Sequence, residues 1–396
     1  MTALDGIRVL DLSRVLAGPY CSMLLGDLGA EVIKVERPGR GDETRGWGPP
    51  FLGEESAYYL SVNRNKRGVA IDLKDERGLE LVRELAAQSD VVLQNFRPGG
   101  AERLGLDAHS LRARTPRLVH CSITGFGSEG PDAQRTGYDA LIQATGGLMS
   151  ITGEPEGAPL KVGVAICDVL AGQMAANGIL AALFHRERSG EGQALEVALQ
   201  DALVSALVNQ AQGYLASGQV PGRLGSAHPH IVPYQTFECA DGHLVIACGN
   251  DGQFAALCGV LELEALATDE RYATNAERVR HREQLLPRLQ ERLRSASAAH
   301  WESALTAARV PAGRIRDLGA VFADPQLHTR GMLVELQHPA IGAYRTPGNP
   351  LRLSATPPAY ERPAPRLGEH TAEVLRELCG VTREELDALR ARGAIH

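Results

Sequence analysis

One aspartate stands where its carboxylate could act as a nucleophile. Asp168 lies in the segment KVGVAICDVLAGQMAANGILAALF, in which an apolar run meets a single acidic residue and continues into a helical pattern with small residues. Asp is a preferred helix N-cap, so the pattern predicts a structural cap. The helix dipole would also keep such a carboxylate ionised and the cap bond would aim it, as nucleophilic catalysis requires. We therefore treat Asp168 as a cap and as a candidate nucleophile.

Other common catalytic signatures are missing from the sequence. The run IRVLDLSRVLAGPY followed by AEVIKVE resembles the start of a dinucleotide-binding unit, but only Gly18 stands where G-x-G-x-x-G would be needed. A Walker-type loop and a G-x-S-x-G pentapeptide are also missing. Cys21 could be a thiolate at a helix N-terminus, but with no histidine nearby in sequence we interpret it as a core residue.

Two histidines flank Pro229 in a loop rich in Gly and Pro. His228 and His230 have a spacing that zinc ligands could use, but no complementary pair of ligands follows, so we predict no metal site. A solvated loop is the default interpretation. The alternative is that both histidines line a cleft between domains and bind an anionic substrate.

Several cations lie at or just beyond predicted strand ends in the first part of the chain. Scattered surface charges would give the same pattern, but ligands of open α/β sheets bind outside the carboxyl ends of the strands. The cations are therefore well placed for a phosphorylated ligand. They are Arg37, Lys66, Arg67, Lys74, Arg97 and Arg103.

The elements that must position these residues alternate between strands and helices over residues 1–200. A helix is predicted over 77–88, where apolar residues recur at helical spacing. The pattern indicates an α/β fold with a mainly parallel sheet. The predicted strands are IRVLDL, AEVIKVE, VAIDL, DVVLQNF, RLVHCSITGF and QALEVAL.

The second half predicts a smaller α+β domain and a return to the first. We expect one long helix over 200–218, then a hairpin in YQTFECADGHLVIAC and helices over 253–261, 282–296 and 299–308. Further strands (MLVELQH, AYRTPG), a Pro-rich spacer and two short helices beginning near Glu369 and Thr382 follow. The predicted organisation is a large domain over 1–200 and 331–396, a linker over 201–224 and a small domain over 225–330.

Composition narrows the classes of function. The 396 residues carry a formal charge of −7 without a concentrated basic run, which argues against nucleic-acid or anionic-membrane partners. No apolar run approaches the roughly 20 residues of a membrane span. Seven cysteines without a CxxC pair fit free thiols. The N-terminus has no targeting pattern, so we expect a cytoplasmic protein.

Six segments, in order, resemble the class III CoA-transferases of the CaiB/BaiF type. They are the opening LDGIRVLDLSRVLAGPYCSMLLGDLGAEVIKVERPGRGDETR, NRNKRGVAIDLK, QNFRPGGAERLGL, the stretch around GYDALIQATGG, Asp168 with its helix, and RLGEHT. Within the family, GDETRGWGPPFLGEESAYYLSVNRNKR and GSAHPHIVPYQTF are most similar to the succinate–hydroxymethylglutarate (succinyl-CoA:glutarate) branch.

The resemblance implies an interlocked homodimer, with a Rossmann-like large domain built from both chain ends. Coenzyme A is then a substrate, with no tightly bound cofactor, and Asp168 and Tyr138 are catalytic. The CoA-binding residues carried over from the family are Leu16, Ala17, Arg37, Ile71, Asp72, Leu73, Lys74, Asn95, Phe96, Arg97, Arg103, Gly137 and Tyr138.

Two departures narrow the reaction within this family. Leu16 replaces a glutamine of the formyl-CoA transferases, and SAHPH replaces their glycine-rich loop, which places formyl and oxalate substrates in doubt. Tyr138 stands where the α-methylacyl-CoA racemases have a histidine base, and a phenol with a pKa near 10 is a poor base at neutral pH. CoA transfer is thus favoured over racemisation.

The predicted reaction moves CoA from succinyl-CoA to a dicarboxylic acid such as glutarate or hydroxymethylglutarate through an aspartyl anhydride and an aspartyl-CoA thioester. The second carboxylate of the acceptor needs a cationic partner. Arg45, Arg64, His228 and His230 are the candidates. An α-methylacyl-CoA racemase-like enzyme and a non-catalytic acyl-CoA-binding protein remain alternatives.

Overall fold

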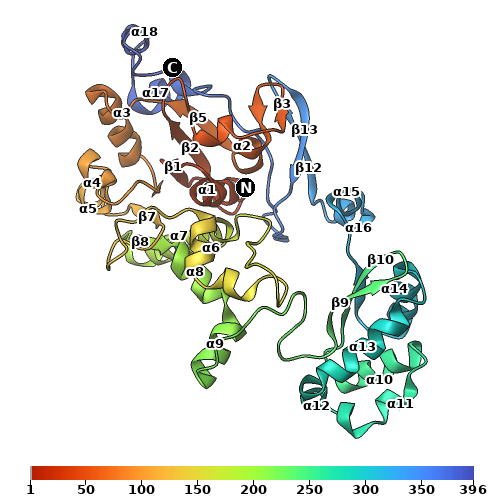
Figure 1. Cartoon of the computed structure of the whole chain (residues 1–396). Helices are drawn as coiled ribbons and strands as arrows, with labels where there is room; N and C mark the ends of the chain where they lie inside the picture. Colours follow the sequence, from red (N-terminus) through yellow and green to blue (C-terminus); the bar gives the residue numbers. More distant parts are fainter. Residues whose placement is uncertain (1) are drawn as a thin grey trace. The chain divides into compact units, whose positions relative to one another are not determined.

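The computed structural model in Figure 1 describes residues 2–396, which group into two units. Unit 1 contains residues up to Leu148, Val162–Ala216 and Gln326–His396, so it combines both chain ends. Unit 2 contains Met149–Lys161 and Ser217–Pro325. These limits differ from the predicted boundaries, because 149–161 group with unit 2 and 201–216 with unit 1.

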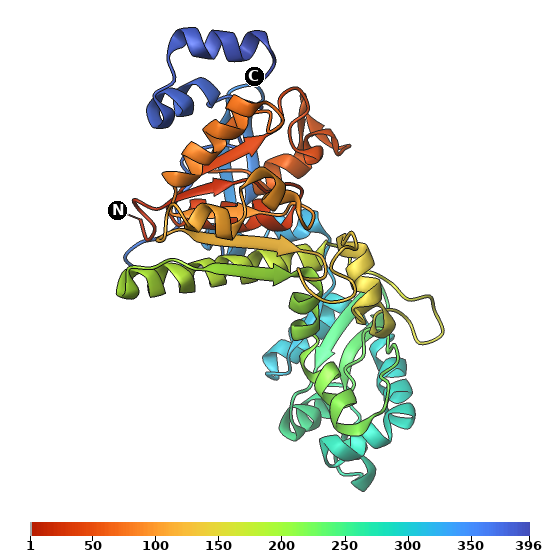
Figure 2. The same ribbon diagram turned by 90° about the vertical axis from the view of Figure 1, so that its left-hand side faces the viewer.

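Unit 1 is organised around a six-stranded parallel sheet with strand order β5-β2-β1-β6-β7-β8. Figure 2 shows its strands running in one direction. The order reverses between β1 and β6, which makes the carboxyl ends of these two strands the expected ligand site of the sheet. The strands are β1 (Arg8–Asp11), β2 (Glu31–Glu36), β5 (Lys66–Ala70), β6 (Val91–Gln94), β7 (Val119–Thr124) and β8 (Ala194–Ala198).

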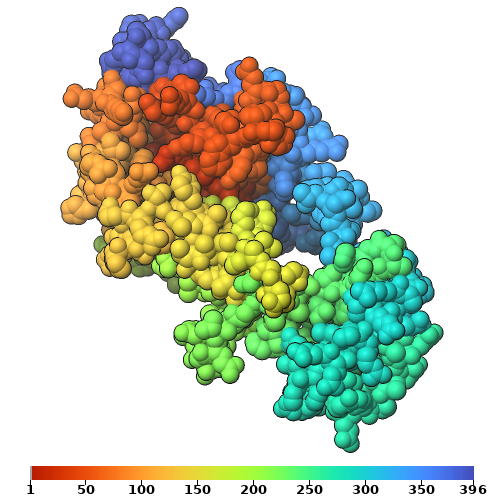
Figure 3. All heavy atoms as spheres, viewed as in Figure 1, coloured from red at the N-terminus to blue at the C-terminus, as the bar shows by residue number. Residues whose placement is uncertain are grey.

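Helices cover both faces of this sheet, as the buried strands of a parallel sheet require. On one face, Val9, Val91 and Val119 pack against α1 (Ala17–Asp27) and α7 (Ile166–Ser189). On the other, Leu10 and Val92 pack against α3 (Glu76–Ala87) and the C-terminal α17 (Thr371–Cys379) and α18 (Arg383–Ala391). In Figure 3 these C-terminal residues, in blue, lie against the orange segment.

Shorter elements complete unit 1. The hairpin of β12 (Leu333–His338) and β13 (Gly342–Pro347) packs on α2 (Ala57–Val62) through Tyr59 and Leu60. The remaining elements are a 3-10 turn at Glu43–Gly46, β3 (Phe51–Leu52), β4 (Glu55–Ser56), α4 (Gly100–Leu104), α5 (Ala108–Arg112), α6 (Asp139–Thr145), α8 (Leu199–Ala206) and α9 (Val208–Ser217).

Two local predictions about unit 1 were wrong. The predicted strand VAIDL is displaced, because β5 ends at Ala70 and the next residues turn into α3, whose N-cap is Asp75. The single long helix expected over 200–218 is divided into α8 and α9. Val208, the first residue of α9, has a φ of 35°, which a continuous helix does not allow.

Helix α7 has the length and apolar composition of a membrane-crossing helix, which the sequence analysis did not anticipate. Its apolar residues Ala171, Ala175 and Ile179 are fully buried against α1 and the sheet. Packing within the core of unit 1 accounts for its apolar face.

Unit 2 has its own core around an antiparallel sheet. The predicted hairpin forms β9 (Tyr234–Cys239) and β10 (Gly242–Ala247), and β11 (Ala312–Arg314) joins β10. Phe237, Leu244 and Trp301 are buried in this core. Its helices are α10 (Asp251–Val260), α11 (Glu264–Ala267), α12 (Asn275–Arg280), α13 (Arg282–Leu293), α14 (Ala298–Ala307) and α15 (Leu318–Phe322); α16 (Pro325–Thr329) leads back to unit 1.

Candidate active site

A narrow pocket lies at the reversal point of the sheet in unit 1, and Asp168 is part of its wall. We call it the Asp168 pocket. Its walls come from the loops that follow β1, β6 and β7, which meet at one edge because the strands are parallel. They include Arg14–Ala17, Asn95–Pro98, Ile123–Gly125, Arg135–Tyr138, Glu43, Trp47 and Asp168.

Asp168 does not cap its helix, contrary to the sequence analysis. Helix α7 begins at Ile166, with Ala165 as the N-cap residue, so Asp168 is its third residue. The backbone amide of Cys167, in the first turn of α7, is bound by a residue of another helix instead. Cys167 N–H donates to Asp139 Oδ1 over 2.8 Å, and Asp139 is the first residue of α6. A carboxylate 29 positions earlier in the chain thus supplies the cap and leaves Asp168 free to face the pocket.

The surroundings of Asp168 favour its protonated form. Burial, and then the negative charge of Asp139, raise the pKa of Asp168 to about 7. These two effects outweigh the helix dipole, which the sequence analysis took as the dominant influence. A carboxylate with little solvation that can ionise near neutral pH is suited to nucleophilic attack.

Two aromatic residues in the surroundings of Asp168, Tyr58 and Trp47, were not predicted from the sequence. Burial, and then the charges of Asp168 and Asp139, raise the pKa of Tyr58 to about 12. The Tyr58 ring contacts Trp47 edge-on, with 5.1 Å between the centroids, and Trp47 lines the pocket. Both follow the 3-10 turn at Glu43–Gly46, where apolar spacing gives no signal of a site.

Tyr138 and Gly137 line the Asp168 pocket, as the prediction of a shared site requires. Tyr138 is the N-cap residue of α6 and its side chain is largely exposed. The two ends of the connection between β7 and α6 meet backbone to backbone, since a Cβ on Gly125 would lie 2.7 Å from the Gly137 Cα. Glycine at both positions therefore allows the two walls to meet.

A second, wider cavity of about 710 Å³ adjoins the first, and we call it the outer pocket. The two share Arg14, Glu43, Trp47 and Phe96 as lining residues. The positively charged side chains of Arg37 and Lys74 are exposed and line the outer pocket. Together the pockets hold every predicted CoA-binding residue except Arg103. The outer pocket is lined by Arg37, Ile71, Asp72, Leu73 and Lys74. The Asp168 pocket is lined by Leu16, Ala17, Asn95, Phe96, Arg97, Gly137 and Tyr138.

Arg103 and two of the strand-end cations lie elsewhere. Arg103 is exposed in the last turn of α4. Lys66 is fully buried at the start of β5, where it pairs with Asp11 over 3.3 Å. Arg67 is also buried at this end and pairs with Glu31 over 2.6 Å. Lys66 and Arg67 are therefore structural cations, because their charges are neutralised inside unit 1.

The predicted acceptor ligands Arg45 and Arg64 are also engaged within unit 1. Arg45 binds both carboxylate oxygens of Glu36 over 2.8 Å. Arg64 is 2% exposed and makes a bidentate pair with Asp27 over 2.8 and 2.7 Å. Both guanidinium groups have the geometry of structural ion pairs. Their N–H donors are occupied, so neither group can form a bidentate pair with a substrate carboxylate.

His228 and His230 lie in unit 2, before β9. The Nδ1 atom of His228 accepts a hydrogen bond from His230 N–H over 3.0 Å. Its ring also stacks near Tyr234, with 5.3 Å between the centroids. These contacts order the loop locally, and a role of either histidine in binding an acceptor stays a prediction.

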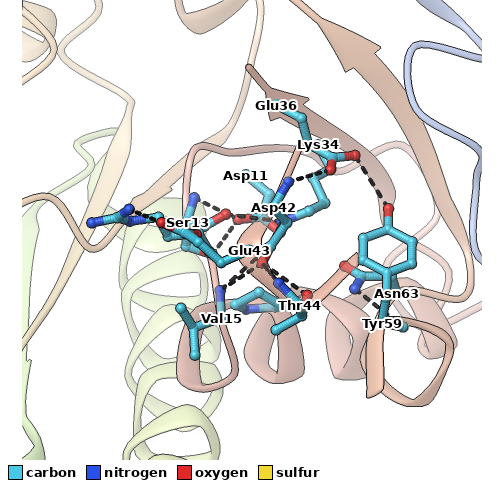
Figure 4. Close-up of polar contacts among 12 residues, drawn as sticks. Asp11, Ser13, Val15, Lys34, Glu36, Asp42, Glu43, Thr44, Tyr59 and Asn63 are labelled. Carbon is cyan, nitrogen blue, oxygen red and sulfur yellow. Dashed lines mark hydrogen bonds and ion pairs between the residues drawn. The ribbon is translucent and has the colours of Figure 1, made fainter. Parts of the chain in front are cut away.

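Buried charges underlie the loop that forms one wall of the Asp168 pocket. Figure 4 shows Lys34 and the backbone of Val15 meeting the carboxylate of Asp42, with Asp11 and Ser13 alongside. Lys34 and Asp42 have fully buried side chains and pair over 3.0 Å. Burial alone would raise the pKa of Asp42, but Lys34 and the Thr44 N–H outweigh it and keep that pKa below its usual value.

Comparison with known proteins is consistent with this geometry. The chain matches the model of CoA-transferase family III over residues 4–371. The succinate–glutarate CoA-transferase of Agrobacterium fabrum is 48% identical over 96% of this chain and 96% of its own length. The human succinyl-CoA:glutarate CoA-transferase is 42% identical over 99% and 90%. The crystal structure of a CAIB/BAIF family protein from Brucella suis has a TM-score of 0.85 and 46% identity, covering 95% of this chain and 99% of that one.

Proposed function

Since the chain belongs to CoA-transferase family III, we propose that it moves CoA from succinyl-CoA to a dicarboxylic acid, with glutarate as the first candidate acceptor. The names of the relatives in Agrobacterium fabrum and human support this choice of substrates. The observation that carries the proposal is the position of Asp168, a half-buried carboxylate with a pKa of about 7, next to a second pocket lined by the exposed cations Arg37 and Lys74.

The paired pockets suit the two ends of an acyl-CoA. The outer pocket offers Arg37 and Lys74 to the phosphates, which favour charge-assisted contacts with cations. Arg97, which is exposed at the Asp168 pocket, adds a third cation. The shared wall of Trp47 and Phe96 gives an apolar path along which the pantetheine arm can bring the thioester to Asp168.

The chemistry then needs one carboxylate. Ionised Asp168 attacks the thioester carbonyl, the C–S bond breaks, and CoA thiolate leaves an acyl–aspartyl anhydride. The thiolate attacks the aspartyl carbonyl, which gives an aspartyl-CoA thioester and free succinate. The acceptor carboxylate reverses these steps and leaves as the new acyl-CoA, so no other reactant is consumed.

The protein's main task in this scheme is to keep water away from the activated intermediates. The narrow Asp168 pocket and the rings of Trp47 and Tyr58 help to exclude water from the intermediates. Backbone N–H groups of the loop at Leu16 and Ala17, together with the Tyr138 hydroxyl, are the candidate donors to the developing oxyanion.

The second carboxylate of the acceptor needs a cation within reach of Asp168. The ion pairs of Arg45 and Arg64 are buried, so the candidates in unit 1 are the pocket-lining Arg14 and Arg135, whose ion pairs with Glu43 and Asp132 are exposed to solvent. The histidines of the SAHPH loop remain candidates from unit 2.

We further propose that the enzyme is an interlocked homodimer. Helix α9 supports this, because along Val208–Ser217 every residue that the structure describes is at least partly exposed. Figure 1 shows it projecting from the end of α8. Its apolar Val208 and Leu215 are 66% and 73% exposed, and such surfaces mark contacts with a partner.

The assay that tests the proposed function follows label from free [14C]succinate into succinyl-CoA, and CoA transfer to added glutarate. We expect label exchange without any other cofactor, and CoA transfer to glutarate, with release of succinate, at a comparable rate. Binding of succinyl-CoA in calorimetry without exchange would instead support a non-catalytic binding protein, and entry of solvent deuterium at C2 of a branched acyl-CoA would support racemisation.

A further inference from the structure

The loop between β1 and α1 contains a valine in an unfavourable backbone conformation. Val15 has a φ of 70°, in the left-handed region that β-branched residues rarely adopt. Arg14–Ala17 form one wall of the Asp168 pocket. A strained residue at a site persists only where its surroundings hold it in place.

Asp42 holds that residue directly. The Val15 N–H donates to both Asp42 Oδ1 and Oδ2, each over 3.2 Å. The same carboxylate accepts from Lys34 Nζ over 3.0 Å and from Thr44 N–H over 3.0 Å. Lys34 Nζ also donates to the carbonyl oxygen of Ser13 over 2.9 Å. The buried Lys34–Asp42 pair therefore binds the loop at Ser13 and at Val15, on both sides of Arg14.

The other peptides of the loop are also held by side chains. Ser13 N–H donates to Asp11 Oδ1 over 2.9 Å. Arg14 N–H donates to Asn95 Oδ1 over 3.0 Å, and Asn95 Nδ2 donates back to the Arg14 carbonyl oxygen over 2.8 Å. Asn95 follows β6, across the reversal point of the sheet, so the loop is tied to both halves of the sheet.

The position of this loop is transmitted to the helix of Asp168. A Cβ on Gly172 would lie 2.6 Å from the Ala17 carbonyl oxygen, so the first turn of α1 touches α7 one turn after Asp168. A shift of the Val15 peptide would move Leu16 and Ala17 relative to the nucleophile. Displacements of this kind, far smaller than a side chain, have large effects on rate.

We propose that Asp42, charged and paired with Lys34, is a positioning residue that holds the strained Val15 peptide and thereby sets the Arg14–Ala17 wall against Asp168. Asp42 is among the residues that line the outer pocket, but its side chain is fully buried and its oxygens are bound by Val15, Lys34 and Thr44. It acts through the backbone of the loop, and this inference rests on the proposed function because the rate of transfer is its readout.

The test is a double-mutant cycle between Asp42→Asn and Val15→Gly. Asn offers one acceptor oxygen and turns an NH2 group toward donors, so it cannot hold Val15, Lys34 and Thr44 together. We expect Asp42→Asn to lower kcat roughly 10- to 100-fold in the wild-type chain. In the Val15→Gly chain the same change should lower kcat less than about threefold, because glycine adopts a φ of this sign without strain.

Asp27→Asn is the matched control. It removes an equally buried carboxylate from its pair with Arg64, but Asp27 lines neither pocket. We expect it to lower stability and leave kcat unchanged. Equal effects of Asp42→Asn in the two Val15 backgrounds, or a kcat no lower than that of Asp27→Asn, would overturn the proposal.

A second measurement covers the case in which Asp42→Asn does not fold. Hydrogen exchange on the wild-type enzyme should show the Val15 amide strongly protected, and exchange as fast as in an open loop would contradict the inference. A wild-type chain without transfer activity would instead refute the proposed function, so the two failures are distinguishable.

Discussion

Two carboxylates from different helices, Asp139 and Asp168, lie at the candidate active site. Asp139 accepts the Cys167 N–H and a hydrogen bond from Gln143 Nε2 over 2.7 Å, so it is fixed and solvated by the protein. Asp168 has burial and the charge of Asp139 acting on it, and both raise its pKa to about 7. A carboxylate that is fixed by hydrogen bonds suits a structural role, whereas a poorly solvated carboxylate that ionises near neutral pH suits nucleophilic attack. We therefore infer a structural role for Asp139 beside the proposed catalytic role of Asp168.

The pH dependence of the reaction should follow Asp168. Only the ionised carboxylate attacks, so we expect kcat/KM for succinyl-CoA to rise with pH through about 7 and level off above it. Asp139→Asn removes a nearby negative charge and should move the midpoint to lower pH. Rates measured across the pH range test this, with Asp387→Asn on the exposed face of α18 as control. A midpoint that Asp139→Asn leaves unmoved would contradict this account.

Only part of this site could be predicted from the sequence. The candidate nucleophile was predicted from one local segment and the candidate CoA-binding residues from family resemblance, and the two pockets bring nearly all of these residues together. The raised pKa of Asp168 could not be predicted, because it depends on a contact with Asp139 on another helix. Arg64 was misassigned for the same reason, since its partner Asp27 is remote in sequence.

Helix α7, which contains Asp168, packs closely against α1. The Ala17 carbonyl, in the first turn of α1, leaves no room for a side chain on Gly172, in the second turn of α7. Small residues let helix backbones come close together. Here the close contact lies between the loop that contains the strained Val15 and the segment that contains Asp168. The apolar, small-residue character of α7 thus serves both core packing and the geometry of the site.

Gly172→Ala should damage both stability and activity. Its Cβ would lie 2.6 Å from the Ala17 carbonyl oxygen, and the backbone there cannot move aside freely. We expect a loss of about 1–3 kcal/mol in the free energy of unfolding, with a lower kcat.

Urea unfolding and initial rates measure these two effects. Gly259→Ala on α10 is the control, since a Cβ there meets no described atom within 4 Å. Unchanged stability and rate in Gly172→Ala would show that the approach of α1 and α7 has no role.

Elements with strong local patterns were predicted well. The strands rich in Val and Ile and the hairpin at the Asp-Gly turn formed as expected. The break at Val208 and the early end of β5 were missed, because they depend on one backbone angle and on the Asp75 cap of the next helix. Apolar periodicity does not report either feature.

At the scale of the whole molecule, the proposed dimer explains why α9 is built as it is. A helix with exposed Val208, Tyr214 and Leu215 and no buried residue among those the structure describes has little reason to be stable alone. A second copy of the chain would cover this surface. Interlocking would further mean that the subunits separate only when they unfold.

Sedimentation should accordingly give the mass of two chains, near twice 42.4 kDa. Tagged and untagged enzyme mixed in the folded state should form no hybrid dimers. Leu215→Asp should weaken the dimer, because it places a charge on the covered face, whereas Ala388→Asp on α18 should not. A monomer at working concentration, or rapid formation of hybrids, would contradict the interlocked dimer.

The most direct test of the account is to capture the covalent intermediate on Asp168. Enzyme incubated with succinyl-CoA in the absence of an acceptor and then treated with hydroxylamine should carry a hydroxamate on the Asp168 peptide, and mass spectrometry locates it. Asp168→Ala should give no adduct and no transfer. Transfer by Asp168→Ala, or a hydroxamate on another carboxylate during turnover, would contradict the central claim that Asp168 is the nucleophile.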